Sequence, residues 1–188
     1  MKQLIDKIKQ EGIVLSDEAL DVSSFLNMQV DANLMNEIGK AFADHYKDYD
    51  FDLLVTVEAS GIAPSVFASI HAGKPLVIIK KSNKLIANKL QQSCDSFTKN
   101  NAYYLTVNQD YIQGKKIILL DDFLAMGSVV ANVEALLHKA NAELVSTGIL
   151  ISKNFQPGYQ KLINEGKDLF CLAEIERLDA ANKKIIFK

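Results

Sequence analysis

The sequence predicts an α/β protein whose central, mostly parallel sheet is flanked by helices. Short aliphatic runs alternate along the chain with segments whose apolar residues recur at helical spacing, as in strands joined by helical crossovers. The run at residues 117–120 has four consecutive aliphatic residues, which is typical of a parallel strand buried on both faces. Ligands of such sheets bind beyond the carboxyl ends of the strands, so the residues that follow each strand are the candidates for function.

The first half of the chain is predicted to contain helices at both ends of an irregular segment, residues 13–30. Asp31 can cap the second helix, because its side chain can accept a hydrogen bond from a free amide of the first turn. Pro64 and Gly73 mark the start and the end of the third helix. The expected helices are 1–11, 32–46 and 64–73, and the expected strands are 51–57 and 76–79.

The second half of the chain continues the alternation. Apolar residues recur at helical spacing after Gly127, and Pro157 opens a short helix that runs towards Gly166. The expected strands are 103–107, 117–120, 142–151, 170–175 and 185–187.

The composition is that of a single globular domain over residues 1–188, with 48% hydrophobic and 23% charged residues. A net charge of −2 argues against non-specific nucleic-acid binding, which needs a basic face. No stretch approaches the roughly 20 apolar residues of a membrane span, and the N-terminus lacks the apolar core of a signal peptide. Cys94 and Cys171 form no zinc or disulfide pattern, so we expect plain thiols in a reducing cytosol and a cytoplasmic protein.

The strand at 117–120 leads into the most informative motif of the chain. Two adjacent carboxylates, Asp121 and Asp122, follow the aliphatic run, and then come Gly127, Ser128 and a helix start. Carboxylates accept hydrogen bonds from sugar hydroxyls, whereas the free amides and the dipole at a helix start favour a phosphate. The combination indicates a site for a ribose phosphate.

This motif resembles the signature with which type I phosphoribosyltransferases bind phosphoribosyl pyrophosphate (PRPP). The resemblance implies that Asp121 and Asp122 hold the ribose hydroxyls and favour the cationic sugar that forms when pyrophosphate leaves. It also implies a loop for the 5′-phosphate, formed by Ala125, Met126, Gly127, Ser128 and Val129. Many relatives carry hydroxyl or acidic side chains in this loop, so here the backbone amides and the serine would have to bind the phosphate.

Two further segments at strand ends suit an anion. Ala59, Ser60 and Gly61 follow the first core strand and precede a helix, so the backbone can approach a ligand closely. Lys80 and Lys81 follow the next strand, although two lysines there are often only a solvated edge. By the family resemblance, both segments hold the pyrophosphate, which needs positive charge as its bond to the sugar breaks.

The interval 80–101 is polar and rich in lysine, yet it lies between two predicted strands. An unstructured stretch of that length inside a compact domain is usually functional and often a lid. The resemblance implies a flexible loop that folds over the site and shields the reacting sugar from water. Further candidates for contact with the diphosphate are Lys84, Lys89 and Lys99.

The turn after the 142–151 strand suits a purine, because Lys153 can donate a hydrogen bond to a ring carbonyl, although a plain surface lysine is the simpler interpretation. Several segments together resemble the xanthine phosphoribosyltransferase family, namely 14–17, 24–27, 58–64, 96–99, 121–125 and 155–158. The resemblance implies a hood over the purine, built from the N-terminal segment, mainly residues 1–45, and from the C-terminal segment. It places purine contacts at Leu20, Asn27 and Lys153.

The implied activity is purine salvage, in which xanthine and PRPP give xanthosine 5′-monophosphate (XMP) and pyrophosphate. The resemblance implies Mg²⁺ bound with the diphosphate, without metal ligands from the protein, and a homodimer with no nucleic-acid or membrane partner. Ala125 stands where hypoxanthine and guanine relatives often place an acidic general base. Xanthine is the more acidic purine and needs such a base less, so Ala125 favours xanthine.

Two other functions stay open. A hypoxanthine or guanine phosphoribosyltransferase would share the fold and differ in the base pocket. A purine-operon regulator that senses PRPP would need a DNA-binding extension, but only about fifty residues precede the first core strand and the net charge is acidic. A binding module without catalysis is disfavoured by the intact acidic pair.

Overall fold

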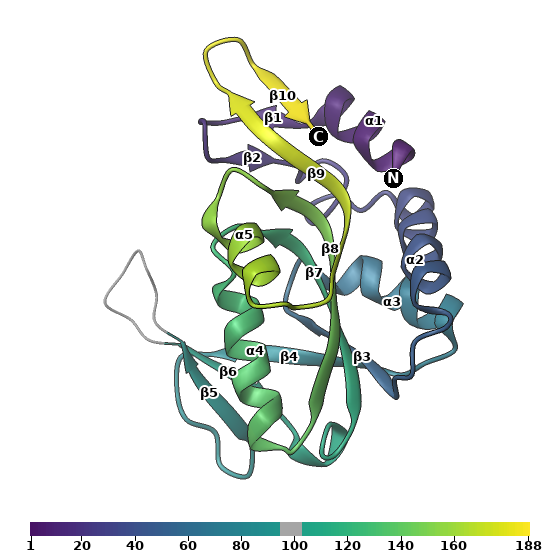
Figure 1. Cartoon of the computed structure of the whole chain (residues 1–188), viewed down its shortest axis with the longest axis vertical. Helices are drawn as coiled ribbons and strands as arrows, with labels where there is room; N and C mark the ends of the chain where they lie inside the picture. The colour runs from purple at the N-terminus through teal and green to yellow at the C-terminus, as the bar shows by residue number, and fades with distance from the viewer. Residues whose placement is uncertain (95–102) are drawn as a thin grey trace.

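An eight-stranded sheet forms the centre of the computed structural model, which describes residues 1–94 and 103–188 (Figure 1). The strand order is β10-β9-β8-β7-β3-β4-β6-β5. The inner strands β9, β8, β7, β3 and β4 run parallel to one another, whereas β10, β6 and β5 are antiparallel additions at the two edges. The predicted class, a mostly parallel sheet flanked by helices, is therefore confirmed.

The elements follow one another along the chain in an alternating order. The strands are β1 Ile13–Val14, β2 Leu20–Asp21, β3 Leu53–Val57, β4 Leu76–Ser82, β5 Leu90–Cys94, β6 Tyr103–Val107, β7 Lys116–Leu124, β8 Glu143–Lys153, β9 Leu169–Asp179 and β10 Lys184–Phe187. The helices are α1 Lys2–Glu11, α2 Ala32–Tyr46, α3 Ile62–Ala72, α4 Ser128–Lys139 and α5 Pro157–Asn164, with a 3₁₀ turn at Gln109–Tyr111. No described helix is long and apolar enough to cross a membrane.

A separate hydrophobic core covers each face of the sheet. Helices α1, α2 and α3 pack on one face, and α4 and α5 pack on the other (Figure 1). Strand β7 contributes to both cores, since Ile118 and Leu120 face the first and Ile117 and Leu119 face the second. The aliphatic run thus lies in a strand buried on both faces, as its sequence predicted.

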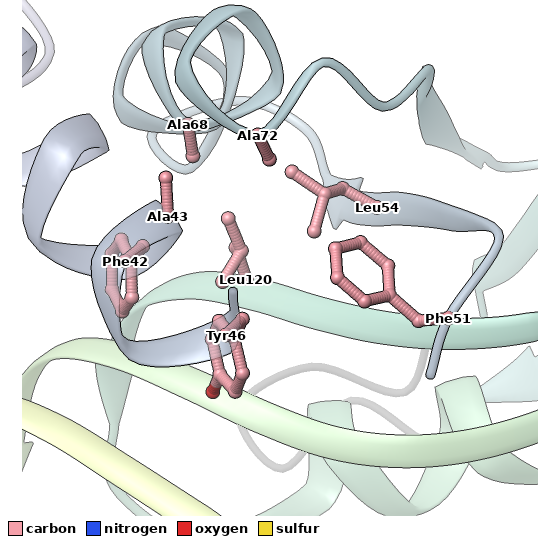
Figure 2. Close-up of a pocket in the computed structure, with 8 residues that line it drawn as sticks. All are labelled: Phe42, Ala43, Tyr46, Phe51, Leu54, Ala68, Ala72 and Leu120. Carbon is pink, nitrogen blue, oxygen red and sulfur yellow. The ribbon is translucent and has the colours of Figure 1, made fainter. Parts of the chain in front are cut away.

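Close packing of α2 on α3 sets the position of the loop that precedes α3. A Cβ atom on Gly39 of α2 would lie 2.5 Å from the carbonyl carbon of Phe67, so only glycine permits this approach. Figure 2 shows how small side chains of α3, Ala68 and Ala72, face the larger Phe42 and Tyr46 of α2 beside Leu54, Phe51 and Leu120. The N-terminus of α3 is therefore held firmly at the carboxyl end of β3.

The chain termini lie together beyond one end of the central strands. Helix α1 and the β1–β2 hairpin lie beside the β9–β10 hairpin (Figure 1). The carboxylate of Asp17 accepts a hydrogen bond of 2.9 Å from the amide of Ala180, which links the N-terminal and C-terminal segments. Residues 13–30, expected to be irregular, are mostly turns with the two short strands of this hairpin.

Local signals predicted helix ends well. The Asp31 carboxylate accepts from the Leu34 amide at 3.1 Å, and Gly73 adopts the left-handed conformation after α3 with φ of 63°. Strand ends were predicted less well, because β4, β7 and β9 all continue beyond the expected residues into polar sequence. Backbone pairing with a neighbouring strand extends them regardless of side-chain polarity.

The interval 80–101 contains more regular structure than its composition indicated. Residues 80–82 complete β4, and β5 was not predicted. Leu90 and Cys94 of β5 pack on the second core, and the polar residues between them are held by antiparallel pairing with β6. The expectation of an unstructured stretch is therefore wrong for these residues. Lys99 and the rest of 95–102 lie outside the described residues, and closure of this interval over the site stays a prediction.

Candidate active site

The acidic pair lies within β7, near its carboxyl end. Asp121 is buried, with 6% of its surface exposed, and Asp122 is half-buried. The Asp121 carboxylate accepts from the amide of Asp122 at 3.1 Å, and the Asp122 carboxylate accepts from the amide of Phe123 at 2.9 Å. Burial, and then the charge of Asp122, raise the pKa of the Asp121 carboxyl well above its usual value, and the Asp122 amide and Lys81 oppose this only in part.

Two adjoining hollows open at this end of the sheet. The first, of about 140 Å³, lies between the β3–α3 connection, Lys81 and the acidic pair. The second, of about 130 Å³, lies under the connection from β7 to α4. Asp121, Phe123 and Val129 line both hollows, whereas Asp122 lines only the first, so Asp121 stands between two compartments of one site.

The first hollow is bounded by residues 58–61, which we call loop 58–61. It contains the predicted Ala59, Ser60 and Gly61, and α3 begins directly after it. The peptide bond between Glu58 and Ala59 is cis. A Cβ atom on Gly61 would lie 2.3 Å from the hydroxyl oxygen of Thr56, so glycine is required for the loop to fold down on β3.

The two predicted lysines differ in position. Lys81 lines the first hollow, whereas Lys80 has 58% of its side chain exposed and pairs with Glu58 at 3.1 Å. Glu58 also accepts from the backbone amide of Lys81 at 2.5 Å. Burial acts to raise the pKa of Glu58, but the Lys81 amide and the Lys80 ammonium outweigh it, so the pKa is lowered. Glu58 was not predicted as a site residue, although its place directly after a core strand makes it a candidate for function.

The second hollow is bounded by the predicted loop 125–129, whose residues run into the first turn of α4. Gly127 has φ of 77°, a conformation that other residues rarely adopt. Amides of the first helical turn lack acceptors within the helix and remain available to an anion. Met126 also lines this hollow and is 48% exposed.

Gly158 of α5 supports loop 125–129 from behind, and the sequence analysis gave it no role. Its amide donates to the carbonyl of Ala125 at 2.9 Å. A Cβ atom on Gly158 would lie 2.5 Å from both the Ala125 carbonyl oxygen and the Gly127 amide nitrogen. The two backbones touch, so the loop conformation depends on a glycine more than thirty residues away in the sequence.

The structure brings two of the three residues predicted to contact a purine, Lys153 and Asn27, to the surroundings of the hollows, whereas Leu20 is a core residue. Lys153 ends β8, donates to the carbonyl of Glu18 at 2.7 Å and lies 5.3 Å from the centre of the Phe123 ring. Burial lowers the pKa of Lys153, although Glu18 and Asp122 act in the opposite direction. Leu20 is buried in β2 within the first core.

Asn27 is directed to loop 58–61. Its side-chain amide donates to the Ser60 hydroxyl at 3.0 Å. The structure therefore brings Lys153 to the N-terminal segment and Asn27 to the first hollow. Phe123, which neighbours Lys153 and lines both hollows, is an aromatic surface of the site that the sequence analysis did not single out.

The phosphoribosyl transferase domain family matches residues 27–170, which contain the acidic pair and both loops, so the chain carries a domain of this family. Among solved structures, adenine phosphoribosyltransferase from Trypanosoma brucei aligns with a TM-score of 0.75 at 17% identity, covering 91% of this chain and 79% of that one. The enzyme of the same name from Rhodothermus marinus aligns with a TM-score of 0.73 at 17% identity, covering 93% and 100%. These likenesses concern the fold.

Sequence relatives narrow the class. Xanthine phosphoribosyltransferase from Clostridium botulinum (strain Eklund 17B / Type B) is 40% identical over 188 residues, which cover 98% of this chain and 99% of that protein. The protein of the same name from Agathobacter rectalis is 41% identical over 182 residues, with 95% of each chain covered. The chain belongs to the xanthine phosphoribosyltransferase family.

Proposed function

We propose that this protein is a purine-salvage transferase that converts xanthine and PRPP into XMP and pyrophosphate. The observation that carries the proposal is the acidic pair, of which Asp121 lines both hollows and Asp122 lines the hollow beside loop 58–61. A ribose between these hollows would present its hydroxyls to the carboxylates, its 5′-phosphate to loop 125–129 and its diphosphate to loop 58–61. Identity of about 40% to curated xanthine phosphoribosyltransferases over nearly the whole chain supports the choice of base.

The acidic pair binds the sugar and stabilises the charge that develops on it. Departure of pyrophosphate leaves positive charge on the anomeric carbon, and carboxylates fixed nearby before the reaction stabilise this charge without rearrangement. The ribose hydroxyls donate hydrogen bonds to the carboxylates, which offsets part of the cost of burying Asp121. The protein's contribution is thus mainly positioning and electrostatic stabilisation.

Loop 125–129 binds the 5′-phosphate through backbone amides and Ser128. These donors lie at the start of α4, where the helix dipole also favours an anion. Their geometry is fixed by Gly127 and by contact with Gly158. The phosphate stays attached to the ribose throughout the reaction, so a rigid cradle keeps the sugar in register.

Loop 58–61 and the basic pair receive the leaving pyrophosphate. Small residues let the backbone approach the diphosphate, and Lys81 supplies positive charge from the wall of the hollow. No group of three or more His, Cys, Asp and Glu within residues 1–94 and 103–188 is arranged to hold a metal ion. The hollow does contain carboxylate oxygens from Asp121 and Asp122, the donor type that Mg²⁺ prefers.

A magnesium ion carried by the diphosphate and water therefore fits beside these carboxylates. When bound, it neutralises charge on the leaving pyrophosphate.

The purine binds between Phe123, Lys153 and the hood. The Lys153 ammonium, which donates to the Glu18 carbonyl in this structure, can donate equally to a purine carbonyl. Leu20 and Asn27 bound the same region from the N-terminal segment. Ala125 provides no acidic base, which suits a purine that loses its own proton readily.

The decisive test is XMP formation by the purified protein with PRPP and Mg²⁺. We expect kcat/KM to be highest for xanthine when xanthine, hypoxanthine and guanine are compared under one set of conditions. Higher kcat/KM for guanine or hypoxanthine would contradict the choice of base, and no nucleotide from any purine would contradict the transferase activity. Light scattering on the same sample tests the homodimer.

A further inference from the structure

A third carboxylate stands in the first hollow, where the proposed function places a strongly anionic product. Glu58 follows β3 directly and lines the hollow together with Lys81 and the acidic pair. Its role in binding the sugar or the base is not evident, because both of its contacts are with residues of β4. An additional negative charge here weakens the binding of any diphosphate unless it does something else.

The contacts of Glu58 divide between its two oxygen atoms. One oxygen accepts from the backbone amide of Lys81 at 2.5 Å and so joins loop 58–61 to β4. The other lies 3.1 Å from the ammonium nitrogen of Lys80. The first contact is a matter of position, since it holds the backbone that carries Lys81 into the hollow. The second is a matter of charge, since it pairs Glu58 with Lys80, one of the two lysines predicted to hold the diphosphate and the neighbour of Lys81 in β4.

The pairing between Glu58 and Lys80 is of a kind that a ligand can break. The side chains are 27% and 58% exposed, and ion pairs as accessible as this contribute at most about a fivefold factor to an equilibrium constant. Glu58 is ionised at neutral pH, because the Lys81 amide and Lys80 lower its pKa against the effect of burial. A diphosphate offers several negative oxygens to the same ammonium group and can displace a single carboxylate.

We propose that Glu58 is an internal counter-ion that competes with pyrophosphate for Lys80, and so sets how readily the product leaves. The inference rests on the proposed function of the site. When the hollow is empty, Lys80 is held by Glu58. When pyrophosphate is bound, Lys80 turns to the diphosphate, and its return to Glu58 favours release. Release of product limits the turnover of many enzymes, so a competing carboxylate in the product compartment has a direct kinetic effect.

The test uses Glu58→Gln, which keeps an oxygen to accept from the Lys81 amide and removes the charge that pairs with Lys80. Pyrophosphate affinity is measured by calorimetry at fixed Mg²⁺ and low salt, without either substrate. We expect binding to become roughly two- to fivefold tighter, the range set by the loss of an exposed competing ion pair. In a Lys80→Gln background the same Glu58 substitution should have no effect, because the contested cation is absent.

Two variants serve as controls. Glu165→Gln removes one negative charge at an exposed position at the end of α5 and should leave pyrophosphate affinity unchanged. Glu58→Ala removes both contacts and should raise the KM for PRPP, because Lys81 is no longer held in position.

Unchanged or weaker pyrophosphate binding in Glu58→Gln would overturn the proposal. Equal tightening with Lys80 present and absent would also overturn it, since Glu58 would then act by general repulsion. The wild-type assay separates these results from the proposed function. If XMP forms but Glu58→Gln does not give the expected Lys80-dependent increase in pyrophosphate affinity, only the counter-ion role is wrong. If no nucleotide forms, the assignment of the site is wrong.

Discussion

The hollow under loop 125–129 and the hollow beside loop 58–61 share a wall, but they are built differently. In the hollow under loop 125–129, backbone amides, Gly127 and the contact with Gly158 make a fixed surface whose one charged lining residue is Asp121. In the hollow beside loop 58–61, the lining residues include Glu58, Lys81 and the acidic pair, and Glu58 forms an exposed ion pair with Lys80. In the proposed reaction, the 5′-phosphate is retained and the pyrophosphate departs. We therefore expect the retained 5′-phosphate to be bound mainly by backbone amides, and the departing pyrophosphate to be bound by side-chain charge as well as by backbone.

Substitution of the acidic pair should have the largest effect on turnover. Replacing both acids, Asp121→Asn with Asp122→Asn, removes the charge that stabilises the cationic sugar in either compartment. We expect turnover to fall by about 10³-fold or more, as for the loss of fixed electrostatic stabilisation at other active sites. Steady-state XMP formation measures it, and near-normal turnover would mean that the ribose does not lie between the hollows.

Stability provides the control for this variant. The folded-state pKa of Asp121 is raised, so the protein loses stability as pH rises from the unfolded pKa towards the folded one. Asp121→Asn removes this loss. The stability of Asp121→Asn relative to wild type should therefore be lowest in acid and should rise as pH increases. A variant that unfolds more readily at pH 8 than at pH 5, relative to wild type, would contradict the effect of burial.

Lys153 lies outside both hollows, so its substitution tests whether base and anion binding are separate. Lys153→Ala removes a charged donor and should raise the KM for xanthine by about 10- to 100-fold, the range for a charge-assisted hydrogen bond. The KM for PRPP should change much less, because neither loop contacts this side chain. Equal loss for both substrates would remove Lys153 from the base pocket.

Gly158 tests the fixed hollow alone. The Cβ atom of Gly158→Ala would press on the Ala125 carbonyl and the Gly127 amide, displacing the donors for the 5′-phosphate. We expect the KM for PRPP to rise on the order of tenfold, and pyrophosphate affinity to stay constant. Gly73→Ala is the matched control. Its φ of 63° is strained for alanine, but nothing lies within 4 Å, so it should lower thermal stability and leave the KM for PRPP unchanged.

Added salt should have a smaller effect, which differs between ligands of the two hollows. Added salt screens exposed side-chain charges, and Lys80 is largely exposed. Between low and physiological ionic strength, we expect pyrophosphate affinity to fall about two- to fivefold more than XMP affinity. Calorimetric titrations with the two ligands across a salt series measure this difference, and equal salt dependence would remove the distinction between backbone and side-chain binding.

Much of this arrangement could be predicted from local sequence. The buried strand at 117–120, the cap at Asp31 and the left-handed Gly73 each follow from a few adjacent residues, and the structure confirms them. The acidic pair was recognisable because it comes directly after the aliphatic run of β7, and both loops were recognisable because each follows a strand directly. Their roles in binding substrate stay predictions.

The remainder depended on contacts between distant residues. Gly158 matters because it touches loop 125–129, and no pattern around residue 158 records that contact. Strand β5 was missed because its polar sequence is held by pairing with β6. Glu58 could have been noticed after its strand, but its partners on β4 become evident only when the two strands are placed side by side.

The hydrogen bond from Asn27 to Ser60 connects the N-terminal segment to loop 58–61. Through this hydrogen bond, a ligand in one of the two proposed compartments can change the binding free energy in the other. A ligand that takes the Ser60 hydroxyl for itself changes the free energy of the segment that covers the base. By linkage, a base that fixes Asn27 changes the affinity of loop 58–61 by the same factor. In the proposed reaction, we therefore expect each substrate to change the affinity for the other through this pair of side chains.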